Sequence, residues 1–227
     1  MGFFENPFSI KPALFDNVLN GYESLIDKIN QTIAESKFIL VYGKYGTGKT
    51  TILKGIINRF GGKKKVIYYN CDKSDRSIDF DSLLINSGSF FTKLFGIKKK
   101  NRIMLLDEAQ DMNQKDFREI KSLYDKCFFF SVVFVSTKED FGMTKDLQIM
   151  IEKNKFKLKE ITEKDAVNLV RKRIGNIEYI SDENISRIFN KDKNPRSFLK
   201  NCEDIFRFAY ESESKEVTLK HIKEILG

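Results

Sequence analysis

One short segment near the start of the chain has the residue types and the spacing that bind phosphate. Residues 43–50 read GKYGTGKT and satisfy the pattern G-x-x-x-x-G-K-[ST] at every fixed position. Gly43, Gly46 and Gly48 allow a tight turn whose backbone N–H groups point inward, and a helix that begins near Lys49 adds its positive N-terminus. A loop of this kind can wrap a di- or triphosphate.

Two side chains of this segment are expected to have separate tasks. Lys49 would reach the β and γ phosphates of a nucleotide, and the hydroxyl of Thr50 would bind a Mg²⁺ ion that bridges them. A glycine-rich turn that matches by chance is the alternative, but the segment falls between a strong strand and a strong helix. The residues expected to contact the nucleotide are Gly43, Lys44, Tyr45, Gly46, Thr47, Gly48, Lys49, Thr50, Thr51 and Asp107.

An acidic pair follows an apolar segment further along the chain. Residues 103–110 read IMLLDEAQ, which places Asp107 at the carboxyl end of an expected strand and Glu108 next to it. Asp107 would hold Mg²⁺ directly or through water, and Glu108 would polarise the water that attacks a phosphate. A strand that simply ends in an acidic turn is the alternative. Together with the phosphate-binding segment, the pair predicts hydrolysis of a bound nucleotide.

Apolar segments typical of strands alternate with segments of helical spacing. The expected strands are residues 38–42, 66–70, 102–107 and 128–136, with a short edge strand at 155–158. Helices are expected directly after the phosphate-binding segment, at 80–95 and at 113–126. This alternation predicts an α/β fold with the parallel five-stranded sheet of a P-loop nucleoside triphosphatase and helices on both faces.

The strand signal stops after Leu158. Start signals for helices then follow at Thr162, Ser181, Pro195 and Thr218. We therefore expect residues 1–158 to form an α/β P-loop ATPase domain and residues 159–227 to form a small, all-helical lid domain.

The composition excludes several classes of protein. Hydrophobic residues make up 41% of the 227 residues, which suffices for a packed core. No segment approaches the ~18 apolar residues of a membrane span, so a cytoplasmic protein without membrane contact is expected. The scattered Cys71, Cys127, Cys202 and His221 disfavour a disulfide framework and a zinc cluster. Lys and Arg outnumber Asp and Glu by 40 to 32, which favours contact with nucleic acid.

The chain resembles the AAA+ ATPases in four features: GKYGTGKT, LLDEAQ, a β-rich strand with a polar end, and the helical C-terminal portion. Within that class it looks most like the replication-initiator and origin-recognition ATPases, which include helicase loaders, and the DEAQ-type transposition ATPases. The opening NPFSIKPALF and VLNGYESLIDKI are similar to the segment that covers the adenine in many members. The resemblance implies ATP and Mg²⁺ as ligands, DNA without sequence preference as a partner, and a protein partner or self-assembly.

The same resemblance implies roles for two further residues. Thr137, just after the strand VVFVS, matches the first sensor, which contacts the attacking water or the γ phosphate, and Ser136 is the neighbouring candidate. Arg196, in NPRSFL at 194–199, matches the second sensor, an arginine that a mobile lid brings to the γ phosphate. A polar strand cap and a surface arginine are the respective alternatives.

One departure from the family pattern concerns the arginine finger, which many members donate to a neighbouring subunit. In TKDLQIMIEKNKF the finger position aligns with Met150, and only Lys145 and Lys153 carry positive charge near it. A missing finger costs ~10³-fold or more in hydrolysis unless something replaces it. We therefore expect a slow ATPase that acts as a switch, or one that borrows its arginine from a partner.

Other P-loop enzymes and other functions fit the sequence less well. TKED at 137–140 resembles the guanine-reading motif of GTPases, but the D-x-x-G that should begin at Asp107 is absent. Nucleoside-type kinases tend to begin with the loop, whereas 42 residues precede Gly43 here, and no arginine-rich acceptor site is visible. A nucleotide-dependent module that recruits a protein and does not bind DNA remains the competing class.

Basic segments outside the nucleotide motifs have two interpretations. The triplets at 63–65 and 98–100 each precede an expected parallel strand, so both would lie at the sheet edge opposite the nucleotide and form one basic patch. Two separate solvated loops are the alternative. RKR at 171–173 is expected to be a solvated helix face.

Overall fold

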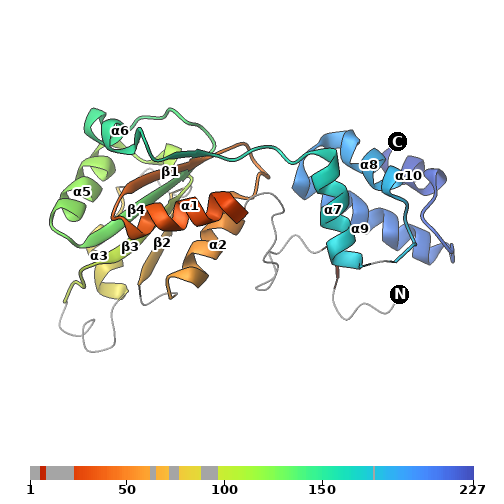
Figure 1. Ribbon diagram of the computed structural model, residues 1–227, viewed down its shortest axis with the longest axis horizontal. Helices are drawn as coiled ribbons and strands as arrows, with labels where there is room; N and C mark the ends of the chain where they lie inside the picture. The colour runs from red at the N-terminus through yellow and green to blue at the C-terminus, as the bar shows by residue number, and fades with distance from the viewer. Residues whose placement is uncertain (1–5, 9–22, 62–64, 72–76, 88–96, 176) are drawn as a thin grey trace. The chain divides into compact units, whose positions relative to one another are not determined.

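The computed structural model describes residues 6–8, 23–61, 65–71, 77–87, 97–175 and 177–227. The chain forms two compact units (Figure 1). The first unit is Ser24–Leu158, and the second contains Lys159–Gly227 together with the described residues near the N-terminus. No helix in the described part of the chain is long and apolar enough to cross a membrane.

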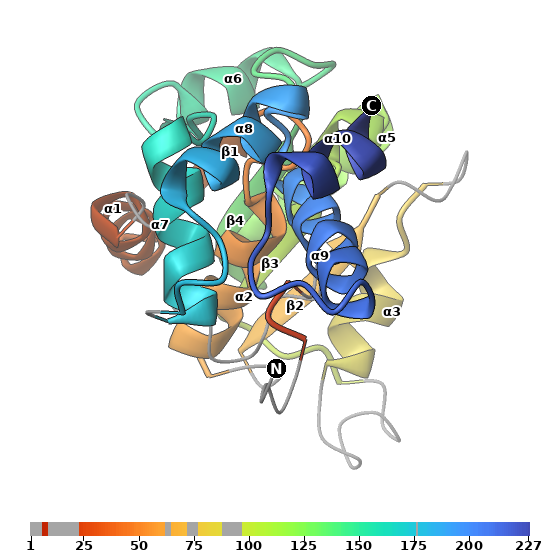
Figure 2. The ribbon, with the colours of Figure 1, turned by 90° about the vertical axis from the view of Figure 1, so that its right-hand side faces the viewer.

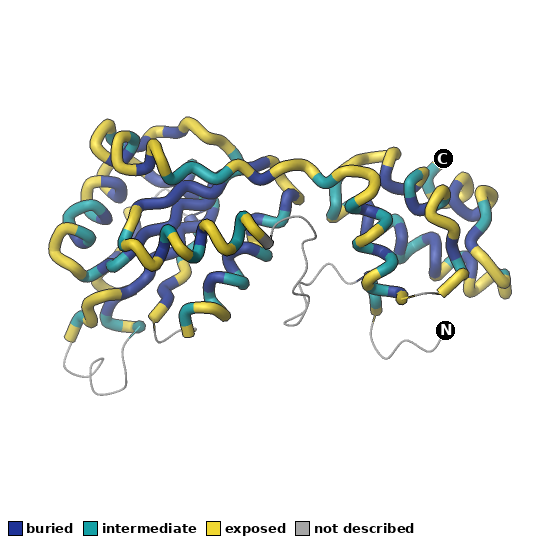
Figure 3. The backbone as a smooth tube through the Cα atoms, viewed as in Figure 1, coloured by how far each residue is buried: buried dark blue, intermediate teal, exposed yellow. Residues whose placement is uncertain are grey.

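The first unit is built on a five-stranded sheet in which every pair of neighbouring strands is parallel. The strands are β1 (Phe38–Tyr42), β2 (Val66–Asn70), β3 (Arg102–Asp107), β4 (Phe129–Ser136) and β5 (Lys155–Lys157). Their order in the sheet is β2-β3-β4-β1-β5. The three central strands are almost continuously apolar because both faces of the sheet are covered, and Figure 3 shows them as a buried interior.

Helices cover both faces of this sheet, as the sequence predicts. The helices are α1 (Glu23–Ala34), α2 (Lys49–Arg59), α3 (Phe80–Asn86), α5 (Gln114–Asp125) and α6 (Lys145–Ile151). The chain runs from β1 to β2 in one direction across the sheet and from β2 back to β4 and β5 in the other. Right-handed crossovers therefore place α2 on one face, and α3, α5 and α6 share a hydrophobic core on the opposite face (Figure 1).

Local sequence explains where these helices begin. Asn113 caps α5 by accepting hydrogen bonds from the N–H groups of Lys115 and Asp116, while the Asp116 carboxylate accepts from the Asn113 N–H. Asp79 caps α3 by accepting from the Ser82 N–H at 2.9 Å. The helix expected at 80–95 is thus present over Phe80–Asn86, and residues 88–96 lie outside the described part of the chain. The α/β fold class with its five parallel strands is confirmed.

The second unit contains the helices predicted for the C-terminal third (Figure 2). They are α7 (Glu163–Ile174), α8 (Asp182–Asp192), α9 (Pro195–Glu211) and α10 (Leu219–Leu226). Thr162, Ser181 and Asn194 each accept a backbone N–H at the start of a helix, which satisfies donors that the helix itself leaves unpaired. Buried apolar residues from all four helices form one core.

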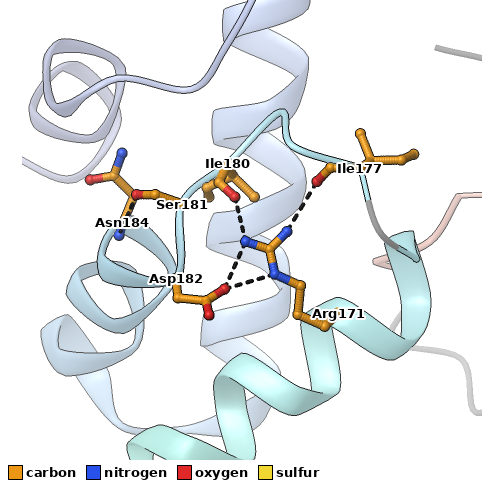
Figure 4. A network of polar contacts seen from close by, with 6 residues as sticks. All are labelled: Arg171, Ile177, Ile180, Ser181, Asp182 and Asn184. Carbon is orange, nitrogen blue, oxygen red and sulfur yellow. Dashed lines mark hydrogen bonds and ion pairs between the residues drawn. The ribbon is translucent and has the colours of Figure 1, made fainter.

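Two features of this unit differ from the expectations. Arg171 is not a purely solvated side chain, because Nε donates to Asp182 Oδ1 at 2.7 Å and the two Nη groups donate to the carbonyls of Ile177 and Ile180 (Figure 4). This arginine ties the turn between α7 and α8 to α7. Phe8, which is one of the residues 1–158 expected to form the α/β domain, is buried in the helical core, with its ring 4.6 Å from that of Phe206.

The contact of the N-terminal residues with the helical unit has a polar component. Arg173 Nη1 donates to the Pro7 carbonyl at 3.1 Å, and Asn6 accepts the Phe8 N–H at 2.9 Å. The described residues 6–8 therefore pack with the second unit rather than with residues 24–158. Most of the segment expected to cover an adenine ring, residues 9–22, lies outside the described part of the chain.

Candidate nucleotide-binding site

The phosphate-binding segment forms the connection between β1 and α2. Its first residue continues the sheet, because the Gly43 N–H donates to the Ser136 carbonyl at 3.2 Å. A Cβ atom on Gly43 would lie 2.8 Å from Thr47 Oγ1 and 2.9 Å from Leu158 Cβ, so no side chain fits there. Gly48, the N-cap of α2, has φ +90°, a conformation that favours glycine. Gly46 also has a positive φ, of +82°. All three glycines of the motif are therefore required by the observed backbone.

Lys49 is folded back into this loop. Its Nζ donates to the Gly43 carbonyl at 2.8 Å and to the Lys44 carbonyl at 3.2 Å, which leaves one of the three ammonium donors for a ligand. The side chain is 6% exposed, and burial lowers the Lys49 pKa, although Glu108 and Asp107 oppose this shift. A buried cation that is partly compensated by neutral carbonyls and distant carboxylates attracts an anion more strongly than a solvated lysine does.

Other loop residues shape its inner surface. Thr47 is buried, and its hydroxyl donates to the Lys44 carbonyl at 2.8 Å, which closes the turn. The Tyr45 ring is 68% exposed, with Lys49 Nζ 5.0 Å from its centroid. Thr50 is an exposed residue in the first turn of α2.

The strand order brings three distant segments to one edge of the sheet. Tyr42 of β1 pairs with Ser136 of β4, and Leu106 of β3 pairs with Phe134 of β4. Because the strands are parallel, β1, β4 and β3 all end at the same edge, with β4 between the other two. The exit of β4 at Thr137 therefore lies between the phosphate-binding loop and the acidic pair.

Asp107 is a buried carboxylate with two hydrogen-bond donors. The Glu108 N–H donates to Oδ1 at 3.0 Å, and the Tyr68 hydroxyl donates to Oδ2 at 3.2 Å. Burial raises the Asp107 pKa above its ordinary value, and the nearby Glu108 carboxylate adds to this, whereas the two hydrogen bonds and Lys49 lower it. Desolvation and the Asp107 charge raise the Tyr68 pKa to about 12, so this hydroxyl stays a donor at neutral pH.

The sequence alone does not mark Tyr68 as a residue of this site. It pairs with Leu105, two residues before Asp107, so Tyr68 and Asp107 side chains lie on the same face of the sheet. Tyr68 could have been found only from its position on β2, the strand next to the one that ends in the acidic pair. That neighbourhood follows from the strand order, which the sequence does not give.

Gln110 links the expected base to the exit of β4. Its Nε2 donates to Glu108 Oε2 at 2.7 Å, and its Oε1 accepts the Thr137 N–H at 3.1 Å. Glu108 itself has φ +51°, a left-handed conformation that costs a non-glycine residue roughly 1–2 kcal/mol. Gln110 lies within LLDEAQ, but the sequence alone assigns it no role.

The two candidates for the first sensor differ in their surroundings. The Ser136 side chain is fully buried, and its hydroxyl accepts the Lys138 N–H at 3.0 Å, as a cap at a strand end does. Thr137 is half-buried at the edge where the loop and the acidic pair converge. This contrast favours Thr137 over Ser136, and its role as a sensor stays a prediction.

The donors available for a metal ion at this edge are few and all oxygen. In the described part of the chain, no group of three or more His, Cys, Asp and Glu residues could hold a metal by itself. Asp107 supplies a carboxylate and Thr50 a hydroxyl. Hard oxygen donors in this number suit Mg²⁺, which keeps several waters and is usually held by one or two carboxylates together with substrate phosphates. The residues present therefore fit a Mg²⁺ ion that enters with a nucleotide.

The remaining predicted residues lie away from this edge or in the other unit. Arg196 is exposed in the first turn of α9, with its backbone N–H bonded to Asn194 Oδ1 at 2.9 Å. Arg196 belongs to the helical unit, and its contact with a γ phosphate stays a prediction. Met150, at the expected finger position, is 37% exposed near the end of α6, close to Lys153, and Lys145 begins that helix.

Comparison with known proteins relates this site to a family. Residues 35–146 match the family described as AAA domain, and no curated protein matches the chain. The fold is similar to that of the Thermotoga maritima RuvB Holliday junction branch migration motor, with a TM-score of 0.69 and 14% identity over 90% of this chain and 68% of that one.

Two Aeropyrum pernix proteins share the fold over most of this chain. Aeropyrum pernix ORC1, solved in complex with DNA, has a TM-score of 0.72 and 15% identity over 98% of this chain and 68% of its own. Aeropyrum pernix ORC2, solved as ADPNP–ADP complexes, has a TM-score of 0.72 and 12% identity over 98% of this chain and 71% of its own. The expected similarity to origin-recognition ATPases is confirmed at the level of the fold. The family match over residues 35–146, the fold and the motifs together confirm the expected resemblance to the AAA+ P-loop ATPases.

Proposed function

We propose that this chain is a Mg²⁺-dependent ATPase that acts as a nucleotide switch on DNA, in replication initiation, helicase loading or the regulation of transposition. The observation that carries the proposal is the convergence of the Lys49 loop, the β4 exit and the acidic pair at one edge of a parallel sheet. A cytoplasmic location is part of the proposal and is supported by the lack of a membrane-spanning helix among the described residues.

The loop supplies binding and orientation. Gly43–Thr51 would surround the phosphates with backbone N–H groups, and the free donor of Lys49 would contact the β and γ phosphates. Thr50 and Asp107 would hold the Mg²⁺ ion, which supplies charge that neutralises the phosphate oxygens during transfer. The bonds from Tyr68 and from the Glu108 N–H fix the Asp107 carboxylate, so its oxygens are oriented before a ligand arrives.

Glu108 would orient the attacking water and accept its proton. Its carboxylate is held by the Gln110 amide, which is bonded to the Thr137 N–H at the β4 exit. Thr137 would contact the water or the γ phosphate, and Arg196 would contact the γ phosphate from the helical unit. Contacts with the γ phosphate are lost on hydrolysis, so two ligand states with different lid positions would result.

ATP is proposed over GTP because the residues after Asp107 are Glu108, Ala109 and Gln110 and do not form D-x-x-G. Hydrolysis is expected to be slow without a partner, because α6 carries Met150 at the finger position. An assembly formed with a non-hydrolysable ATP analogue, seen by light scattering, would show that a neighbouring subunit or partner can complete the site.

DNA is proposed as the partner on two grounds. The chain has a formal net charge of +8, and a solved structure with the same fold is ORC1 in complex with DNA. The alternative is an ATP-dependent module that recruits a protein and does not bind DNA. If the protein binds no random duplex DNA at low salt, either with or without ATP, this alternative is favoured.

The catalytic part of the proposal is tested with two substitutions. Lys49→Ala should abolish Mg·ATP binding measured by calorimetry, and Glu108→Gln should retain binding but stop phosphate release. Lys200→Ala and Glu224→Gln, at exposed positions of the helical unit, are the matched controls and should behave as the unmodified protein. Normal hydrolysis by Glu108→Gln would overturn the assignment of the base, and no heat on titrating Mg·ATP into the unmodified protein would overturn the nucleotide site.

A further inference from the structure

The edge of the sheet opposite the nucleotide site carries a row of lysines. Because all five strands are parallel, their amino ends share this edge, and each strand has an exposed lysine within three residues before its start. In the order of the sheet, from β2 to β5, these residues are Lys65, Lys99 with Lys100, Lys126, Lys37 and Lys153. From the sequence, the two lysine triplets could form either one patch here or two separate solvated loops, and residues 63–64 of the first triplet lie outside the described residues.

The backbone under this row is fixed by the sheet. The Ile103 N–H donates to the Lys65 carbonyl at 2.9 Å, and the Val132 N–H donates to the Lys37 carbonyl at 3.2 Å. The Lys100 ammonium lies 5.7 Å from the centroid of the Phe128 ring. The lysines are therefore attached to the rigid edge of a sheet and not to a flexible tail.

These charges have little local compensation. Within the described ranges, Lys37, Lys65, Lys99, Lys126 and Lys153 form no ion pair. Acidic residues close to the edge are paired with other lysines: Asp81 with Lys98 at 2.6 Å, Asp125 with Lys121 at 2.8 Å and Glu152 with Lys155 at 2.8 Å. Glu35 is the exposed acidic residue beside Lys37. The edge thus has a surplus of positive charge.

The spacing of the row fits a polyanion of regular charge. Five strands at about 4.8 Å span roughly 19 Å. Neighbouring strands are thus separated by about half the Debye length of ~10 Å at 0.1 M salt, so the charges of neighbouring lysines repel one another. Duplex DNA carries about one phosphate charge per 1.7 Å of its axis and presents several to a strip of this length. Bound phosphates would relieve the repulsion along the row.

Single-stranded nucleic acid is less well matched to this edge. Single strands are usually held by aromatic rings on which bases stack. The exposed aromatic side chains in the described segments are Tyr45 in the phosphate loop, Tyr68 beside Asp107 and Tyr210 on α9, none of which lies at the amino ends of the strands. We infer that the amino-terminal edge of the sheet binds the phosphate backbone of duplex DNA.

This inference rests on the proposed function and names the surface that contacts DNA. The edge lies at the other end of the strands from Lys49 and Asp107, so a nucleotide and a duplex can be bound together. Binding here reads no sequence, because lysines on phosphates position a duplex without contacting base edges.

The test compares two triple variants of the full chain that have the same net charge. The edge variant is Lys65→Gln, Lys99→Gln and Lys126→Gln, and the control is Lys200→Gln, Lys220→Gln and Lys223→Gln, at exposed positions of the helical unit. A fluorescent 30-base-pair random duplex is titrated at several salt concentrations. The edge variant should bind about tenfold or more weakly, and its slope of log affinity against log salt should be about 2.7 units shallower; the control should match the unmodified protein.

The possible failures separate the two proposals. If the edge variant binds duplex with the same affinity and the same salt slope as the unmodified protein, this inference is overturned and DNA remains the partner. Unmodified protein that does not bind duplex would overturn DNA binding itself. Tighter binding to a single strand of equal length, lost in the same variant, would overturn the choice of duplex. Mg·ATP titrations of both variants should be unchanged, which shows that each is folded.

Discussion

Replacement of Gly43 by alanine tests the tightest contact of the phosphate loop. The new Cβ would lie 2.9 Å from Leu158 Cβ, 2.8 Å from Thr47 Oγ1 and 3.2 Å from the Leu158 carbonyl, whereas carbon atoms pack best at about 3.5–4.0 Å. Leu158 cannot move away freely, because its N–H donates to the Tyr42 carbonyl at 2.7 Å beside the β1–β5 pairing. Overpacking of this kind costs about 1–3 kcal/mol.

Gly55 provides the matched control within the next helix. A Cβ at Gly55 would meet nothing within 4 Å, and the residue lies inside α2, where alanine is preferred to glycine by about 0.5–1 kcal/mol. Gly55→Ala should therefore raise the free energy of unfolding and Gly43→Ala should lower it, a separation of about 1.5–4 kcal/mol between the two variants.

Urea unfolding followed by circular dichroism and by tyrosine fluorescence measures both effects, since the chain has eight tyrosines and no tryptophan. Calorimetry should in addition show weaker Mg·ATP binding for Gly43→Ala, because the loop must shift to accept the methyl group. Gly43→Ala with unchanged unfolding and unchanged Mg·ATP affinity would refute the claim that Leu158 confines this residue.

Three further substitutions or reactions test the site. Burial raises the pKa of Asp107 in the folded protein, so the contribution of this carboxyl to stability is greatest below about pH 3.8 and is lost as the pH rises through the folded pKa. Asp107→Asn should therefore increase the free energy of unfolding at pH 7 and weaken Mg·ATP binding. A lower free energy of unfolding at pH 7 would contradict this. Gln110→Leu should slow phosphate release with little change in ATP affinity, because Glu108 loses its amide partner; equal turnover would argue against a positioning role. Cys127 is exposed and should react with iodoacetamide at pH 8 in the folded protein, whereas Cys71, buried with a pKa raised to about 12, should react only after unfolding, which mass spectrometry can follow.

The sequence predicted the fold well wherever the signal was local. The apolar segments at 38–42 and 102–107 and the glycines of the loop have short-range patterns that leave few alternatives. The helix starts at Thr162 and Ser181 follow from side chains that cap their own helix.

The contacts that the sequence did not predict all join residues far apart in the chain. Tyr68 reaches Asp107 only because β2 and β3 pair in one particular register, and Phe8 reaches Phe206 across most of the sequence. Gln110 bonds to Thr137 because β3 and β4 are neighbours that end at the same edge. Such pairings depend on tertiary packing, which local periodicity does not encode.

Lys49 stabilises the conformation of the phosphate loop as well as supplying positive charge. Its ammonium group joins the carbonyls of Gly43 and Lys44 to the first turn of α2, so the residue that would grip a phosphate also maintains the curvature of the backbone around it. Replacing it with alanine relaxes that curvature at the same moment as it removes the charge. The shape of this loop and its affinity for phosphate therefore both depend on the Lys49 side chain.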